Sequence, residues 1–168
     1  MRIRRAEKKD LPEITEIFNQ AIENTTATFT DELKTPESME ARLEQHDHYF
    51  PMLVAEEEGK VMGWASLNPF ISRYSFRGTA GVSIYIREAS RGQGIGKTLL
   101  SQLIDMAYQL EHRTIIAWIE GENWESIKLH QDLGFAFKGN LEKVGCKFGR
   151  FLDLHVYQLF LKNPEADS

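Results

Sequence analysis

The chain has 168 residues, 42% of them hydrophobic and 27% charged, with a formal net charge of -5 at pH 7. This length is typical of one domain with a substantial core, and the mildly acidic balance without a basic stripe disfavours a nucleic-acid partner. The single cysteine, Cys146, excludes an internal disulfide, and no apolar run is long enough to span a membrane, so we expect a cytoplasmic protein.

The first half of the chain predicts two helices and three strands. Asp10, followed three residues later by Glu13, indicates a capping box before an amphipathic helix that reaches Ile22. A second helix is expected from Thr35 to about Gln45, because Pro36 suits a first helical turn. The expected strands span residues 2–5, 52–57 and 61–68, the last two joined by the hairpin signal Glu58-Gly59-Lys60.

The second half predicts a regular alternation of strands and helices. Strands are expected over residues 81–86, 114–119, 135–141 and 151–161, and helices over 99–110 and from Asn123 to a stop at Gly134. The order β-α-α-β-β-β-α-β-α-β-β implies an α/β fold with a mixed sheet and helices on its faces. We expect one domain over residues 1–162 and a flexible tail over 163–168.

A glycine-rich run separates the strand at 81–86 from the helix at 99–110. It comprises Arg91, Gly92, Gln93, Gly94, Ile95, Gly96, Lys97 and Thr98. Alternating glycines at a helix start let backbone N–H groups converge on an anion, which predicts a pyrophosphate site. A nucleoside-triphosphate P-loop is excluded because Arg91 stands where its first glycine is required, and a dinucleotide fingerprint fails at Lys97 and at Leu99.

The loop resembles the phosphate-binding loop of the GNAT superfamily of acetyl-CoA-dependent N-acetyltransferases, whose pattern is Arg/Gln-x-x-Gly-x-Gly/Ala. Arg91, Gly94 and Gly96 carry that pattern here. The segment from Asn123 to Phe135 resembles a second GNAT signature, N-x-x-[SA]-x-x-L-[YH]-x-x-x-G-[FY]. The resemblance implies the GNAT fold, acetyl-CoA as co-substrate and no metal. It also implies that the cofactor's thioester end lies against Ser83, Ile84, Tyr85, Ile86, Asn123, Ser126 and His130.

Three further segments, 24–29, 79–86 and 145–153, resemble the phosphinothricin N-acetyltransferase branch. Members of this branch acetylate the α-amine of phosphinothricin, methionine sulfoximine or related amino acids, and they commonly form homodimers. The resemblance implies a homodimer whose acceptor pocket includes Phe29, Arg73, Phe76, Tyr85 and Phe148. Arginine suits a carboxylate or phosphinate clamp because its guanidinium can donate two parallel hydrogen bonds.

The chain departs from this branch at the position of the general base. Gly81 stands where the branch usually has a glutamate that accepts the amine proton. Ile71, Phe76 and Phe148 replace lysine, tyrosine and histidine of characterised relatives. These changes make the expected pocket less polar and leave the identity of the acceptor open.

The reaction can proceed without that glutamate, because an amine with a pKa of about 8 is roughly one-tenth neutral near pH 7. General-base help typically contributes about 10²–10⁴-fold. We expect Glu120 to be a substitute base, His130 to donate a proton to the departing thiolate, and backbone N–H groups of residues 83–86 to stabilise the developing oxyanion.

Three functions remain open from the sequence. The favoured one is N-acetylation of a small amino-acid-like amine. An acetyltransferase of protein termini, lysines or polyamines is the second, although an arginine clamp argues against an open protein-binding groove. The third is a non-catalytic acetyl-CoA sensor, which the glycine at position 81 makes conceivable. His46 and His48 are two residues apart and so do not suggest a metal site.

Overall fold

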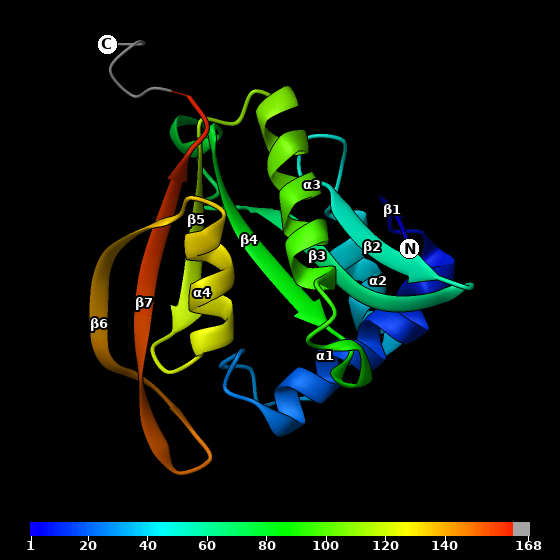
Figure 1. Ribbon diagram of the computed structural model, residues 1–168, viewed down its shortest axis with the longest axis horizontal. Coiled ribbons are helices and arrows are strands. Elements are labelled where there is room, and N and C mark those ends of the chain that lie inside the picture. The colour runs from blue at the N-terminus through cyan, green and yellow to red at the C-terminus, as the bar shows by residue number, and fades with distance from the viewer. Residues whose placement is uncertain (163–168) are drawn as a thin grey trace.

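The computed structural model describes residues 1–162, which build one seven-stranded mixed sheet flanked by helices (Figure 1). The strands are β1 (Arg2–Arg5), β2 (Met52–Glu57), β3 (Lys60–Pro69), β4 (Thr79–Ile86), β5 (Thr114–Glu120), β6 (Ala136–Lys147) and β7 (Arg150–Phe160). The helices are α1 (Leu11–Asn24), α2 (Pro36–Glu44), α3 (Ile95–Gln109) and α4 (Trp124–Asp132). The expected α/β class and element order are confirmed, whereas the tail at 163–168 lies outside the described residues.

The strand order in the sheet is β1-β2-β3-β4-β5-β7-β6, and β4 and β5 are its one parallel pair within the described chain. These two strands pair only from Thr79 with Thr114 to Gly81 with Ile116. Beyond that point β4 remains paired with β3, and β5 remains paired with β7. The carboxyl halves of β4 and β5 therefore diverge and split the sheet.

Two layers of helices cover the sheet, with α3 and α4 in front of it and α1 and α2 behind it in Figure 1. The alternation of side chains along β3 divides the core accordingly. Ala65 and Leu67 belong to the cluster under α3, and Trp64 belongs to the cluster under α1 and α2. None of the helices in residues 1–162 is long and apolar enough to cross a membrane.

The same alternation decides which side chains of β4 meet each layer. Val82, Ile84 and Ile86 pack against the cluster under α3. Tyr85 packs against the cluster under α1 and α2, so Gly81 and Ser83 share that second face. The acceptor-side residues predicted on this strand therefore face α1 and α2.

Several boundaries differ from the prediction. Helix α3 begins at Ile95, four positions before the expected Leu99, because Gly94 already acts as its N-cap in a left-handed conformation. Strand β6 runs on to Lys147, past two register irregularities that interrupt its alternation of side chains. The hairpin therefore turns only at Phe148 and Gly149, both of which have positive φ.

The predicted capping box at Asp10 is wrong. The Asp10 carboxylate instead accepts hydrogen bonds from both terminal nitrogens of Arg4, at 2.7 and 2.8 Å, and from the Glu7 amide at 2.8 Å. Glu13 accepts from the Val61 amide at 3.1 Å and pairs with Arg87 at 2.9 Å. Asp10 thus binds Arg4 and the amide of the preceding turn at Glu7, Glu13 binds Val61 and Arg87, and neither forms the Asp10–Glu13 capping box that the spacing indicates.

Candidate active site

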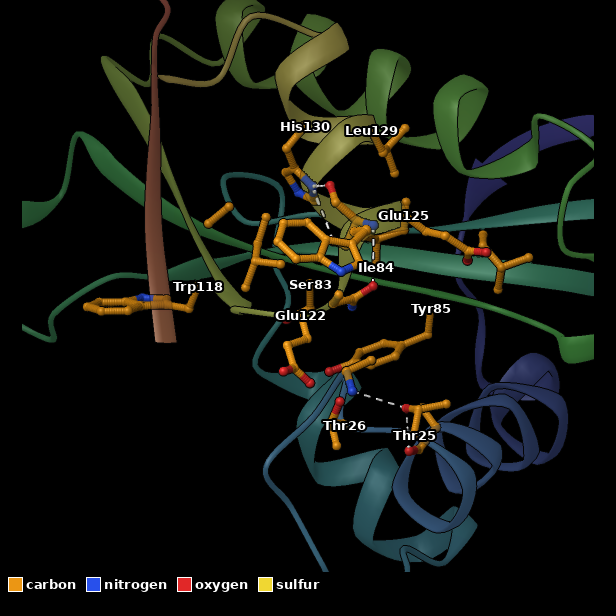
Figure 2. Close-up of a pocket in the computed structure, with 18 of the residues that line it drawn as sticks. Thr25, Thr26, Ser83, Ile84, Tyr85, Trp118, Glu122, Glu125, Leu129 and His130 are labelled. Carbon is orange, nitrogen blue, oxygen red and sulfur yellow. Dashed lines mark hydrogen bonds between the residues drawn. The ribbon is translucent and has the colours of Figure 1, made fainter. Parts of the chain in front are cut away.

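The split between β4 and β5 opens into a cavity of about 760 Å³ (Figure 2). Residues 82–86 of β4 form one wall, and residues 117–119 of β5 form another. The end of α1 with its following loop, the first turns of α4 and the turn between β6 and β7 complete the lining. This volume lies within the range of about 300–1,000 Å³ that is typical of small-molecule sites.

The residues predicted around the thioester end of the cofactor all line this cavity. They are Ser83, Ile84, Tyr85, Ile86, Asn123, Ser126 and His130, and Arg91 of the glycine loop joins them. The other loop residues, Gly92, Gln93, Gly94, Ile95, Gly96, Lys97 and Thr98, form the turn after Arg91 and the first turn of α3. Segments far apart in the sequence therefore meet at one site.

The glycine loop has the backbone geometry that an anion site requires. Gly92 and Gly94 have φ of 76° and 79°, a left-handed conformation that side chains rarely adopt. The first intrahelical bond of α3 runs from the Thr98 amide to the Gly94 oxygen, so the N–H groups at 95–97 precede the helical ladder. Unpaired amides and the helix dipole both favour a negative group there.

Gly96 serves a different purpose, which is close packing of α3 on α4. A Cβ atom at this position would lie 3.4 Å from Cδ2 of Leu129 and 3.8 Å from Cγ1 of Ile86. A larger side chain would push α3 away from α4 and β4. The glycine therefore holds the phosphate loop close to the cavity wall.

The exposed edge of β4 supplies backbone hydrogen-bonding groups to the cavity. Beyond Gly81 the strand has no pairing with β5 in the described structure, although it remains paired with β3 as far as Ile86. Alternate backbone groups of residues 82–86 therefore face the cavity rather than a neighbouring strand. Such fixed amides are suited to hold an extended amide-containing chain or to stabilise a developing oxyanion.

His130 lies at the cavity wall on α4 with only 2% of its surface exposed. Its Nδ1 lies 2.7 Å from the Ser126 carbonyl oxygen, which can only accept, so Nδ1 carries a proton and donates it. Burial lowers the pKa of the imidazole, and this backbone hydrogen bond opposes the shift. At neutral pH the ring is therefore neutral, with a lone pair on Nε2.

Tyr85 lines the cavity from the face of β4 that packs against α1 and α2. Its ring packs 4.9 Å from Phe18 and 5.0 Å from Trp64, measured between ring centroids. Burial raises the pKa of the Tyr85 phenol, and a hydrogen bond with Thr28 and the charge of Arg42 oppose the rise. The phenol is thus neutral at pH 7 and available as a hydrogen-bond donor or acceptor.

Ser83 is held in place by a neighbouring amide. Nδ2 of Asn68 donates to Oγ of Ser83 at 3.0 Å, and Oδ1 of Asn68 accepts from Ser66 at 3.0 Å. Asn68 also pairs with Gly81 in the sheet. The polar surface around Ser83 therefore continues to the position at which the branch has its glutamate.

The other residues predicted to bind the acceptor are arranged less uniformly. Phe148 lines the cavity, whereas Phe29 does not and packs instead against Gly145, where an added Cβ would lie 3.0 Å from its ring. Arg73 is exposed on the loop before β4. Phe76 is not among the lining residues. Its ring centroid lies 6.1 Å from that of Phe70, and the Phe70 ring in turn stacks at 6.2 Å on Trp118, which does line the cavity.

Glu120 is buried at 3% exposure and is not among the residues that line the cavity. Its carboxylate accepts a hydrogen bond from the Glu122 amide at 2.9 Å. The carboxylate of Glu122 itself does line the cavity, together with Arg150 of β7. Sequence reasoning missed both residues, because Glu122 is placed by the loop that begins at Gly121 and Arg150 by the turn between β6 and β7 at Gly149.

Lys147 was also missed by the sequence. It is 5% exposed, and its ammonium donates to the carbonyl oxygens of Thr25 and Thr28 at 2.8 and 2.9 Å. Burial lowers the pKa of this lysine, and the charge of Asp31 opposes the shift. Because Thr25 lines the cavity, Lys147 fixes the loop that forms one side of the site to the end of β6.

Within residues 1–162, no group of three or more histidine, cysteine, aspartate and glutamate side chains is placed to hold a metal ion. The cavity lining supplies backbone amides, neutral hydrogen-bonding side chains and a few charges. Such groups can bind, orient and polarise a substrate.

Comparisons with known proteins agree with this geometry. The family model described as an acetyltransferase (GNAT) domain matches residues 3–156. An L-methionine sulfoximine/L-methionine sulfone acetyltransferase from Salmonella typhimurium is 41% identical over 167 residues, 99% of this chain and 98% of that protein. The L-amino acid N-acyltransferase MnaT of Escherichia coli is 40% identical over 170 residues, 100% of this chain and 99% of that protein.

A solved structure shows the same fold with a ligand bound. It is a GNAT superfamily phosphinothricin acetyltransferase from Sinorhizobium meliloti in complex with acetyl-CoA, with a TM-score of 0.94 and 36% identity. The match covers 98% of this chain and 90% of that chain. Fold, site and sequence agree that the chain is an acyltransferase, and it belongs to the GNAT family of acetyltransferases.

Proposed function

We propose that this enzyme transfers an acetyl group from acetyl-CoA to the α-amine of a small amino-acid-like acceptor of the phosphinothricin or methionine sulfoximine type. The observation that carries the proposal is the split between β4 and β5, because its cavity joins the glycine loop to Asn123, Ser126 and His130. We further propose a single domain over residues 1–162 that works as a cytoplasmic homodimer, as is common in the branch it resembles.

Features at both ends of the site support binding of the cofactor. The pyrophosphate is proposed to bind the loop from Arg91 to Thr98, mainly through the N–H groups at 95–97 that precede the helical ladder, where Gly92 and Gly94 keep the backbone open. The pantetheine arm would follow the free edge of β4 toward Asn123, whose side chain caps α4 by accepting from the Ser126 amide at 3.3 Å. When bound, acetyl-CoA supplies the electrophilic thioester carbon.

The residues around the thioester are proposed to act mainly through position and polarity. Backbone N–H groups on the free edge of residues 83–86 would stabilise the negative charge that develops on the thioester oxygen. Tyr85 would contact the acceptor with its neutral hydroxyl group. The imidazole of His130 is neutral, and its Nδ1–H donates to the Ser126 carbonyl oxygen. We therefore propose that Nε2 accepts a hydrogen bond, whereas the sequence suggested that His130 donates a proton.

Glu120 and the residues predicted to bind the acceptor are proposed to act mainly by shaping the site or by contacting the acceptor, without taking part in proton transfer. Because its buried carboxylate already accepts from the Glu122 amide, we propose that Glu120 shapes the loop before α4. Phe148 would contact the acceptor directly, and Phe29 would support the adjacent hairpin at Gly145. Arg73 and Phe76 belong to the exposed loop beside the rim, from which they would contact an acceptor that extends out of the cavity.

A turnover assay tests this function. The purified protein, acetyl-CoA and a panel of amino acids, polyamines and peptides are mixed, and free thiol is measured. We expect the highest kcat/KM with methionine sulfoximine, methionine sulfone or phosphinothricin. A higher kcat/KM with peptides or polyamines would contradict the proposal, and tight acetyl-CoA binding without turnover would identify a sensor, which the glycine at position 81 would then explain.

A further inference from the structure

Two opposite charges face the cavity from different segments of the chain. Nη2 of Arg150 lies 2.5 Å from Oε2 of Glu122, and both residues line the cavity. Their side chains are 59% and 65% exposed. In Figure 2 the Glu122 side chain points toward the part of the cavity where Tyr85 and Thr26 lie. This is the side of the cavity on which the acceptor is proposed to bind.

The backbone under each charge is fixed although the charges themselves are exposed. The backbone N–H of Glu122 donates to the buried Glu120 carboxylate at 2.9 Å. The backbone N–H of the preceding Gly121 donates to the backbone carbonyl oxygen of Asp153 at 3.0 Å. A Cβ at Gly121 would lie 3.1 Å from both Asp153 and His155, so the loop is pressed against β7. Arg150 follows the tight turn at Gly149 and pairs with Lys147 in the hairpin.

The other charged residues of the lining are Arg91 and Glu125, with His130 neutral at pH 7. Arg91 belongs to the glycine loop, at the pyrophosphate end. In Figure 2 the Glu125 side chain extends beside Ile84 in the direction opposite to the Tyr85 ring, whereas the ring points toward Glu122. Glu122 and Arg150 are therefore the two charges available to a small acceptor next to Tyr85.

We propose that Glu122 and Arg150 form a dyad that recognises the two charges of an α-amino acid, with the acceptor carboxylate on Arg150 and its amino group on Glu122. The inference rests on the proposed function and narrows its acceptors to molecules with a free carboxylate next to the amine. It assigns the carboxylate clamp to Arg150, because Arg73 is exposed on a loop outside the lining.

The chemistry of the pair supports this role. An exposed ion pair contributes little to folding, so replacing each partner by a charge of the substrate costs the protein little. The guanidinium can donate two parallel hydrogen bonds to the acceptor carboxylate. The glutamate can accept hydrogen bonds from the amino group and can take up the proton that an ammonium must lose before its nitrogen attacks the thioester.

The test compares the best amino acid of the panel with its carboxamide, which lacks the negative charge next to the amine. For the wild-type protein we expect kcat/KM to be higher for the acid than for the carboxamide by about tenfold or more, as the loss of a charged hydrogen bond predicts. Arg150→Leu should reduce that ratio to about threefold or less, since the clamp is absent. Glu122→Gln should lower kcat/KM for both acceptors.

Two controls separate recognition from a purely structural ion pair. The combined variant Glu122→Arg and Arg150→Glu keeps a pair but exchanges its charges, so a structural role predicts full activity whereas recognition predicts continued loss. Lys128→Leu removes an exposed salt bridge between Lys128 and Asp132 on α4 and should leave the acid-to-carboxamide ratio of kcat/KM unchanged. Acetyl-CoA affinity, measured by calorimetry, should be equal in all of these variants.

The outcomes distinguish this inference from the function on which it rests. A wild-type protein that acetylates no amine would refute both. Turnover of amino acids with an acid-to-carboxamide ratio that Arg150→Leu does not change, or full activity in the charge-exchanged variant, would overturn the dyad and leave the proposed function standing.

Discussion

Restoring the glutamate at position 81 should accelerate the reaction at neutral pH. A Cβ atom at Gly81 would have one near neighbour, the Asn68 carbonyl oxygen at 3.8 Å, which is an ordinary contact. The side chain would project from the same face of β4 as Ser83 and Tyr85, both of which line the cavity. Gly81→Glu should therefore fold normally and place a carboxylate on the acceptor side.

The expected gain follows from the protonation of the amine. With an amine pKa of about 8, roughly one-tenth of the acceptor is neutral at pH 7, so a base can recover about tenfold from this source alone. General-base catalysis typically contributes about 10²–10⁴-fold. Because Glu122 is proposed to supply part of that help, we expect Gly81→Glu to raise kcat/KM on methionine sulfoximine by at least about tenfold at pH 7, or about 1.4 kcal/mol of barrier.

Steady-state rates from pH 6.5 to 9.5 test this prediction. The gain should be about tenfold smaller at pH 9.5, where the amine is already neutral without help. Gly81→Gln is the matched control, since it has the same size without a basic carboxylate, and it should give no gain. An unchanged rate in Gly81→Glu, or an equal gain in Gly81→Gln, would refute our placement of the missing base.

Three further variants test other parts of the structure. Gly96→Val places a Cβ atom 3.4 Å from Cδ2 of Leu129, adds two methyl groups beyond it and should weaken acetyl-CoA binding by about tenfold in calorimetry; unchanged affinity would contradict close packing at the loop. Lys147→Met removes two hydrogen bonds to the Thr25–Thr28 segment and should raise the acceptor KM about tenfold with kcat changed less, whereas Lys143→Met on the same strand should have no effect. Burial lowers the pKa of His112, so the unfolded state binds more protons near pH 6. Thermal stability should thus be full above pH 6.5 and fall toward pH 5, and His112→Gln should flatten this dependence; an identical pH profile in that variant would contradict it.

The sequence was sufficient for the fold because its signals are local. Each expected strand and helix occurs, since apolar periodicity, Pro36 in a first turn and Gly134 at a helix end act within a few residues. The errors concern the ends of helices and strands and the hydrogen-bond partners of charged side chains. Asp10 and Glu13 have capping-box spacing but bind Arg4 and Arg87 from other segments, which no local pattern reveals.

The site was predictable where a motif fixes the backbone and unpredictable where tertiary contacts do. The glycine loop and Asn123 lie where their motifs place them, at the start of α3 and α4. Glu120 was expected at the site because it follows the strand at 114–119 and is close in sequence to Asn123, whereas the chain turns at Gly121 and brings Glu122 to the cavity. Arg150 could not be found from its sequence neighbours, because its partner comes from a loop 28 residues away.

Calorimetric titration of the purified protein with acetyl-CoA tests the central claim most directly. We predict one binding site per chain, with affinity reduced at least about tenfold by Gly94→Val, because a β-branched side chain disfavours the left-handed backbone of the loop. Absence of binding by the wild-type protein, or full affinity in the variant, would contradict a cofactor site at the start of α3.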